Sequence, residues 1–428
     1  MMEGVSVWLL YVFGALLVLR FLLRNLNWFL YEHKLGEKQY YLPPGDMGWP
    51  LIGNMCSFFS ALRTNNPESF MDSFYTRYGK TGIYKALMFG NPSVMVTTPE
   101  ACKRVLTDDN KFTVGWPRAT VELMGKKSFI SISYEEHKHL RRLTSASING
   151  YEALSVYLTY IEEAVIIKED AHVMENLEKE FTALNYGLRA MPINLPGFGF
   201  YTALKAKDMM NALIDVEDEN GKKLSGEDIT DILLMYLNAG HESSGHIIMW
   251  TTYFLQTHPH FFKKAKEEQE EIVRKRPPTQ KGLSLAEVRK MEYLSKVIDE
   301  TLRLISFSLT VFREAKSDVN INGYLVPKGW KVLVWFRSVH LDPEIYPNPK
   351  EFNPGRWNEL HKAGEFLPFG AGSRLCPGND LAKLEISVFL HHFVLNYELE
   401  RLNPLAPMRF LPHPRPIDNC MARINRVK

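Results

Sequence analysis

The sequence predicts a mainly α-helical protein with a small β-rich subdomain. Residues 227–256 form a long apolar stretch with helical spacing, and residues 135–180 keep a helical pattern without proline. Residues 84–97 instead mix β-branched and aromatic side chains around the pair Asn91-Pro92, which predicts a β-hairpin with its turn there. Further helices are expected over residues 291–305 and after Gly378.

The bulk composition is that of an ordinary globular protein. Of the 428 residues, 45% are hydrophobic and 23% charged, so a large buried core is feasible. The formal net charge of +2 gives no indication of a nucleic-acid partner. The four cysteines are widely spaced and form no CxxC pair. This spacing argues against a disulfide framework and against a structural zinc site, and it leaves room for one functional thiolate.

The N-terminus predicts a single membrane anchor. Residues 4–30 are mostly apolar and uncharged apart from Arg20 and Arg24. A bilayer core needs roughly 20 apolar residues in a helix, and arginines near a helix end can extend to the headgroups. Basic residues follow the apolar run, so the positive-inside rule places the protein body in the cytosol. We expect residues 1–41 to form anchor and hinge and residues 42–428 the main domain; a buried N-terminal helix is the alternative.

The strongest functional signal lies at residues 369–378, Phe-Gly-Ala-Gly-Ser-Arg-Leu-Cys-Pro-Gly. Glycines such as Gly372 and Gly378 let the backbone approach a flat cofactor closely. Cys376 precedes a predicted helix, whose N-terminus stabilises a thiolate. Arg374 can pair with a carboxylate of the cofactor. A turn with an incidental thiol is the alternative.

This segment resembles the haem-binding loop of the cytochrome P-450 superfamily, and the match includes Phe369. The resemblance implies that fold, with haem b as cofactor and Cys376 as the thiolate ligand of its iron. The ExxR motif Glu300-Thr301-Leu302-Arg303 and the segment 352–357, which contains Arg356, follow in the family's chain order. The resemblance implies that Glu300, Arg303 and Arg356 form a buried charge cluster behind the haem loop. For so short a motif, a solvent-exposed pair is the alternative.

Residues 239–244, in the middle of the long predicted helix, match the family's oxygen-activation motif. The resemblance implies that Ala239 and Gly240 leave room for dioxygen beside the iron. Glu242 and Ser243 would relay protons, as catalytic residues. A capped or kinked buried helix is the alternative.

Three basic residues match positions that bind the haem propionates in the family. They are Arg141, Arg313 and Arg374, and His137 stands where many members carry Trp. Histidine can also donate a hydrogen bond to a propionate. A solvated basic helix face is the alternative for the segment around His137 and Arg141.

At a finer level the chain is similar to the plant ent-kaurenoic acid oxidases and, next to them, the β-amyrin oxidases. The carrying segments are residues 41–54, 88–92, 105–109, 184–187, 234–246 and 376–383. The resemblance implies stepwise oxidation of ent-kaurenoic acid to the first gibberellin by a single-pass protein of the endoplasmic reticulum membrane. Dioxygen would be the oxidant, with electrons from NADPH through a partner reductase. Triterpenoid oxidation is the alternative, and candidate pocket residues by position are Trp116, Met124, Phe129, Leu237, Leu309, Thr310 and Val311.

The chain departs from the family pattern at two places, near residues 166–172 and 206–211. The family has further helices at both, so this chain is several dozen residues short. Losing packed helices would expose apolar surface worth roughly 25 cal/mol per Å². A second hypothesis, from a different class, is therefore a non-catalytic shortened isoform.

Overall fold

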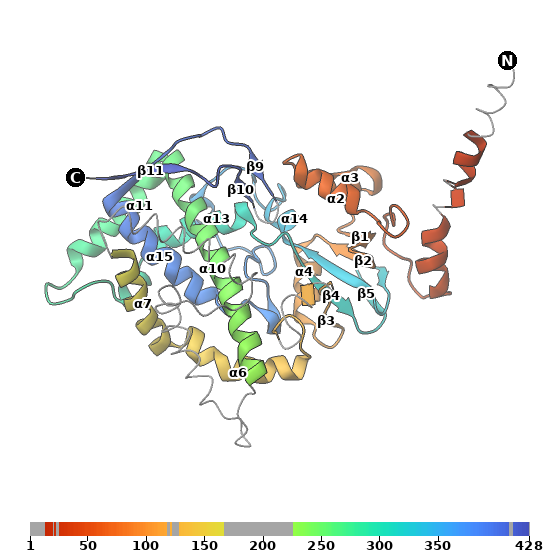
Figure 1. The fold of residues 1–428 in the computed structure, drawn as a ribbon, viewed down its shortest axis with the longest axis horizontal. Helices are drawn as coiled ribbons and strands as arrows, with labels where there is room; N and C mark the ends of the chain where they lie inside the picture. Colours follow the sequence, from red (N-terminus) through yellow and green to blue (C-terminus); the bar gives the residue numbers. More distant parts are fainter. Residues whose placement is uncertain are drawn as a thin grey trace, which may run out of the picture.

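A computed structural model gives the fold as a helical body joined to a smaller β-rich part (Figure 1). It describes residues 13–19, 21–22, 25–117, 120–121, 128–166, 226–410 and 414–427. For residues 164, 166, 226–238, 241 and 242 it describes the backbone alone. The predicted mainly α-helical class with a small β-rich part is confirmed.

The helical body is built around α10 (Gly226–Thr257), which crosses it (Figure 1). Packed against α10 are α11 (Pro259–Lys275), α13 (Glu292–Ile305) and α15 (Asn379–Asn396). The other described helices of the body are α6 (Tyr134–Asn149), α7 (Tyr151–Ile166) and the short α12 (Leu285–Val288). Leu294, Val297 and Val388 are fully buried among these helices. The predicted helices at residues 227–256 and 291–305 are therefore confirmed.

The β-rich part contains a five-stranded sheet in the order β1-β2-β7-β4-β3, in which only β2 and β7 pair in parallel. Its strands are β1 (Ile83–Met88), β2 (Asn91–Val96), β3 (Phe112–Val114), β4 (Thr310–Ala315) and β7 (Lys331–Trp335). The helices of this part are α2 (Met55–Arg63), α3 (Glu68–Tyr78), α4 (Pro99–Thr107) and α14 (Phe336–His340).

Three two-stranded sheets complete the described strands. Asn322 and Gly323, both with positive φ, join β5 (Val319–Ile321) to β6 (Tyr324–Val326) in a tight hairpin. The other pairs are β8 (Tyr397–Arg401) with β11 (Ala422–Arg426) and β9 (Met408–Arg409) with β10 (Arg415–Pro416).

The predicted hairpin at residues 84–97 exists, but its turn was placed two residues too late. The chain reverses at Phe89 and Gly90, which have φ values of 51° and 73°. Asn91 and Pro92 belong to β2 and face β1. A proline at the start of a strand is tolerated, because the parallel pairing with β7 begins only at Ser93. Two positive φ values give the turn whose twist matches the flanking strands.

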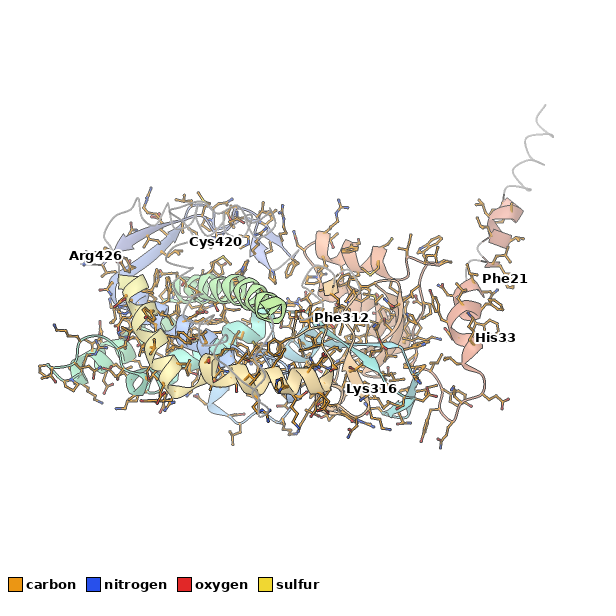
Figure 2. The ribbon with its side chains drawn as sticks, turned by 60° about the horizontal axis from the view of Figure 1, so that its bottom comes forward. Phe21, His33, Phe312, Lys316, Cys420 and Arg426 are labelled. Atoms are coloured by element: carbon orange, nitrogen blue, oxygen red, sulfur yellow. The ribbon has the colours of Figure 1, made fainter. Side chains whose placement is uncertain are left out.

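The N-terminal segment around Phe21 stands away from the body (Figure 2). It is followed by η1 (Trp28–Glu32) and η2 (His33–Leu35), and Glu32 pairs with Lys85 of β1 at 2.8 Å. Its side chains are largely exposed, with Phe21 at 68%. Within the described part of the chain, no helix has both the length and the apolar character needed to cross a bilayer. The first 12 residues of the predicted anchor lie outside the described residues.

The hinge after the anchor is fastened to the body through Asp46. Its carboxylate accepts hydrogen bonds from Gly48 N (2.9 Å), Asn54 Nδ2 (3.0 Å) and Tyr78 OH (2.9 Å), and it pairs with Arg77 at 2.6 Å. Burial by itself raises the pKa of Asp46, but the hydrogen bonds from Asn54 and Tyr78 and the charge of Arg77 outweigh burial, so that the pKa is lowered. The chain just after the hinge is therefore held in place by a charged contact.

We predict that Asp46→Asn lowers the free energy of unfolding by about 1 kcal/mol at neutral pH, because it weakens several charge-assisted hydrogen bonds at a partly exposed site. Since the folded pKa is depressed, this stabilisation is present above the unfolded value of about 3.9 and is lost as the pH falls through the folded value. Urea unfolding across that range measures it. The control is Glu344→Gln, at a carboxylate that is 76% exposed, which should change little. An Asp46 effect that persisted unchanged in acid would contradict the prediction.

Candidate active site

A largely apolar cavity of about 500 Å³ lies between α10, α6, the strand β4 and the loop before α15. It gathers most of the sequence-predicted site residues in one place. Those that line it are His137, Arg141, Ala239, Gly240, Ser243, Arg313, Phe369, Arg374, Cys376 and Gly378. Gly372 does not line it, and the side chain of Glu242 lies outside the described residues.

The loop that carries Cys376 is a tight turn closed on itself. The Cys376 N–H donates to the Phe369 carbonyl at 2.9 Å, and η4 (Gly372–Arg374) lies between them. Gly372 has φ 72°, and a Cβ there would lie 2.3 Å from the Leu106 carbonyl oxygen at the end of α4. Only glycine satisfies both the backbone angle and this close approach. Gly372 thus sets how the loop rests on α4, which explains why it is needed although it does not face the cavity.

The sulfur of Cys376 faces a setting that favours the neutral thiol until a cation binds. Burial raises the pKa of Cys376, whereas the Gly378 N–H and the charge of Arg141 act in the opposite direction but do not prevail. A metal ion bound to the sulfur would supply the missing positive charge and remove the proton. Asn149 at the end of α6 fixes the following residue, because its Nδ2 donates to the Pro377 carbonyl at 2.5 Å.

Three arginines crowd around a buried histidine on one side of the cavity. His137 is 4% exposed, so it does not belong to a solvated helix face. Burial, then the charges of Arg374, Arg141 and Arg313, lower the pKa of His137 to about 3, which keeps it neutral. Burial and the charge of Arg313 lower the pKa of Arg374 to about 10. Burial also lowers the pKa of Arg313.

Among the described residues, few negative charges act on this cluster. Asp109, which accepts a hydrogen bond from Ser373 at 2.9 Å, opposes the lowering of the pKa at Arg313 and Arg374. Arg141 Nη1 is buried and has no hydrogen-bond partner among the described residues. Buried donors are rarely left unpaired. A flat apolar group that carries carboxylates and a metal ion, such as haem, therefore fits the cations, the apolar walls and the thiol together.

The central helix presents small residues to the cavity. A Cβ added at Gly240 would meet no atom within 4 Å among the neighbours, so this part of the helix faces open space. The Ser243 hydroxyl donates to the Ala239 carbonyl one turn earlier at 2.7 Å. The helix nevertheless stays a regular α-helix through this tract. The oxygen of the Ser243 hydroxyl can still accept a hydrogen bond from a further donor.

Behind the loop, one buried carboxylate gathers five hydrogen bonds. Glu300 on α13 is 0% exposed and pairs with Arg303 through two bonds of 2.8 and 2.9 Å. It also accepts from Arg356 Nε and Asn353 N, each at 2.9 Å, and from Trp357 Nε1 at 3.1 Å. The last three belong to or adjoin η3 (Pro354–Asn358). The structure thus brings Glu300, Arg303 and Arg356 together inside the protein, not on its surface.

The pocket residues predicted by position divide into three groups. Trp116, Phe129 and Val311 line the cavity, whereas Leu309 and Thr310 do not. On β4 the side chain of Thr310 points to the face opposite that of Val311, because side chains alternate along a strand. The side chains of Met124 and Leu237 lie outside the described residues.

Sequence reasoning missed several apolar lining residues, among them Leu106, Ile247 and Phe307. Ile247 lies four residues after Ser243 on α10, so the helical period alone could have predicted it. The same period predicts that Leu106 of α4 is buried, four residues after Cys102. Phe307 lies just beyond the end of α13, where no periodic signal applies.

Comparison with known proteins places these features in a family. The family model for cytochrome P-450 matches residues 43–191 and 200–420. A retinoic acid bound cyanobacterial protein of solved structure is similar with a TM-score of 0.73 and 24% identity, over 91% of this chain and 100% of that one, which shows the fold.

Curated relatives are much closer in sequence. Ent-kaurenoic acid oxidase 2 of Arabidopsis thaliana is 57% identical over 99% of this chain and 98% of its own length. Ent-kaurenoic acid oxidase of Oryza sativa subsp. japonica is 48% identical over 97% and 94%. Beta-amyrin 11-oxidase of Glycyrrhiza uralensis is 45% identical over 100% and 98%. The first alignment has 482 positions against 428 residues in this chain, so at least 54 positions are filled by the relative alone.

We predict that Glu300→Gln lowers the free energy of unfolding by about 3–5 kcal/mol, because it leaves Arg303 and Arg356 without their buried counter-charge. The measurement is urea unfolding followed by circular dichroism. Glu267→Gln is the matched control, since Glu267 is 58% exposed and pairs with Lys263 at 3.8 Å on the surface of α11. That control should change stability by less than about 1 kcal/mol. Equal effects of the two substitutions would refute the assignment.

Proposed function

The chain belongs to the cytochrome P-450 family, and on that premise we propose that it is a haem-thiolate monooxygenase that oxidises ent-kaurenoic acid. The observation that carries the proposal is the cavity in which the Cys376 sulfur, the arginine cluster and the small residues of α10 meet. When bound, haem b would supply the oxygen-activating chemistry through an iron held by a cysteine thiolate.

The chain's own residues would hold this cofactor both at its iron and at its propionates. Cys376 is the proposed metal ligand, and Phe369, Gly372 and Gly378 shape its loop. Arg374, Arg313 and Arg141 would bind the propionates, and the unpaired Nη1 of Arg141 supports this role. His137, neutral and buried, can donate one further hydrogen bond.

On the opposite side, α10 would handle dioxygen and protons. Ala239 and Gly240 leave open space along the cavity. Ser243 would hold a proton donor at its hydroxyl oxygen, and Glu242 would deliver protons from water. Each hydroxylation would insert one oxygen atom of dioxygen into a C–H bond and release the other as water, which consumes two protons and two electrons. The electrons would come from NADPH through a partner reductase.

Support for the substrate comes from the relatives and from the walls of the cavity. Two ent-kaurenoic acid oxidases of Arabidopsis thaliana are 57% and 56% identical to this chain. Phe307, Val311 and Ile247 give the cavity the apolar wall that a diterpenoid skeleton requires. A β-amyrin-type triterpenoid is the second candidate, supported by the relative that is 45% identical.

We further propose that the apolar N-terminus anchors the protein in the endoplasmic reticulum membrane, with the body in the cytosol. Exposed Phe13, Leu17 and Phe21 support this, since a helix in water would not leave them uncovered. The arginines that follow support the cytosolic orientation. We also propose that the missing positions fall near residues 166–172 and 206–211, away from every haem motif, and that the shortened chain remains catalytic; a non-catalytic isoform is the alternative.

We predict that the membrane pellet of cells expressing the chain shows a red-shifted Soret band after reduction and carbon monoxide binding, and that Cys376→Ala abolishes it. The physical reason is that only a thiolate donates enough electron density to the iron to shift the band. Cys56→Ala, at an exposed cysteine on α2, is the control and should keep the band. A band that survives in Cys376→Ala would refute the ligand, and recovery of the chain in the supernatant would refute the anchor.

We predict that microsomes containing the chain and a NADPH-dependent reductase convert ent-kaurenoic acid to oxidised products and leave β-amyrin unchanged. The assay is mass spectrometry of extracted products, with carbon monoxide as inhibitor control. Oxidation of β-amyrin alone would assign the triterpenoid function. A normal Soret band without any product would assign the non-catalytic isoform.

A further inference from the structure

A fully buried histidine, His340, lies between the helix that carries Glu300 and the loop that carries Cys376. It is the last residue of α14 and is 0% exposed. Its Nδ1 lies 2.9 Å from the Ser306 hydroxyl, and its Nε2 lies 3.0 Å from the backbone nitrogen of Leu367. Both ring nitrogens therefore have partners, one on each side.

The two contacts fix the direction of every hydrogen bond. A backbone N–H can only donate, so Leu367 donates to Nε2 of His340. The Ser306 hydroxyl already donates to the Arg303 carbonyl at 2.9 Å, so Nδ1 must donate to Ser306. Burial, then the charges of Arg303 and Arg337, lower the pKa of His340 to about 3, and the ring stays neutral. The result is one continuous chain of donors from Leu367 to Arg303.

On the side of α13, the series of hydrogen bonds ends at residues whose positions are fixed by the helix. Ser306 follows the last residue of α13 in the left-handed conformation, with φ 43°. Arg303 Nη1 donates to the main-chain carbonyl of His340 at 2.8 Å. Thus both the ring and the backbone of His340 are tied to the helix that holds Glu300.

On the loop side, the series of hydrogen bonds is connected to Cys376 through the turn that begins at Leu367. The Leu367 carbonyl accepts from Gly370 N at 3.1 Å, and the Phe369 carbonyl accepts from Cys376 N at 2.9 Å. Leu367 is buried, whereas the residues between it and Cys376 are only partly covered or exposed. The contact with His340 is therefore the buried attachment of the loop's N-terminal end.

We propose that His340 is a positioning residue that fixes the main chain of Leu367 and thereby holds the Cys376 sulfur in place as a metal ligand. The hydrogen bonds of the His340 ring fix Leu367, whereas the size of the ring does not. The proposal goes beyond the oxidation of a terpenoid, and its test needs no substrate.

Two substitutions separate hydrogen bonding from packing. His340→Phe keeps a ring against Phe336 and Phe366 but removes both hydrogen bonds. His340→Gln keeps an acceptor near the position of Nε2. The matched control is His391→Phe on α15, because His391 is 1% exposed and its Nδ1 lies 2.8 Å from Gln269 Oε1, away from the loop.

The measurement is the rate at which the red-shifted Soret band of the reduced carbon monoxide complex is lost at fixed temperature, with haem content determined in parallel. We expect His340→Phe to lose the band at least about tenfold faster than His391→Phe. A buried N–H left unpaired destabilises the native loop enough to change a rate by about a factor of ten. His340→Gln should recover most of the difference. Ser306→Ala, which removes only the far end of this series of hydrogen bonds, should lose the band at a rate between those of His340→Phe and His391→Phe.

Equal rates for His340→Phe and His391→Phe would overturn the proposal, as would a His340→Gln variant as labile as His340→Phe. If His340→Phe does not accumulate, Ser306→Ala decides: a rate no faster than that of His391→Phe overturns the proposal. A wild-type chain that takes up no haem overturns it as well. Normal spectra without terpenoid oxidation would instead refute the catalytic function proposed above and leave the role of His340 standing.

Discussion

The carboxylate of Glu300 is the constraint to which the rest of the site is fitted. Removing a carboxylate from water costs several kcal/mol, and that cost is offset only when its lone pairs are satisfied. Here five hydrogen bonds satisfy them, two from the neighbouring Arg303 and three from a segment more than fifty residues away. Because each missing donor would leave a buried charge exposed to a low dielectric, the fold must bring α13 and η3 together.

From this cluster the geometry extends to the cysteine loop by short, directional contacts. Arg303 reaches the carbonyl of His340, and the ring of His340 reaches Leu367. On its other side the loop rests on α4 through Gly372 and on α6 through Asn149. The sulfur is therefore held from several directions by elements that each belong to a packed core. A preorganised ligand of this kind keeps its position whether or not a cation is bound.

The parts of the fold with a strong local pattern were predictable, and those set by distant contacts were not. Periodicity over 227–256 predicted α10, and the i,i+3 spacing of Glu300 and Arg303 predicted one helix face. The turn at Phe89 and Gly90 was missed, because Asn91-Pro92 is the stronger local turn signal whereas pairing with β1 and β7 sets the register. Likewise nothing near His340 in the sequence signals its partners, which lie 34 and 27 residues away.

The shortening bears unequally on the two halves of the proposed chemistry. The hydrogen bonds that hold the cysteine loop, Arg374 and Glu300 are made among described residues of α6, α13, α14 and η3 and the loops beside them. At least 54 positions of a relative have no counterpart in this chain, yet these hydrogen bonds are formed. A hydrogen-bonded site of this kind keeps its geometry when positions elsewhere in the chain are missing, because buried hydrogen bonds depend on their immediate partners. Enclosure of an apolar substrate instead depends on the total buried area, which missing positions reduce wherever they would be packed. Cofactor binding should therefore tolerate the missing positions better than substrate oxidation does.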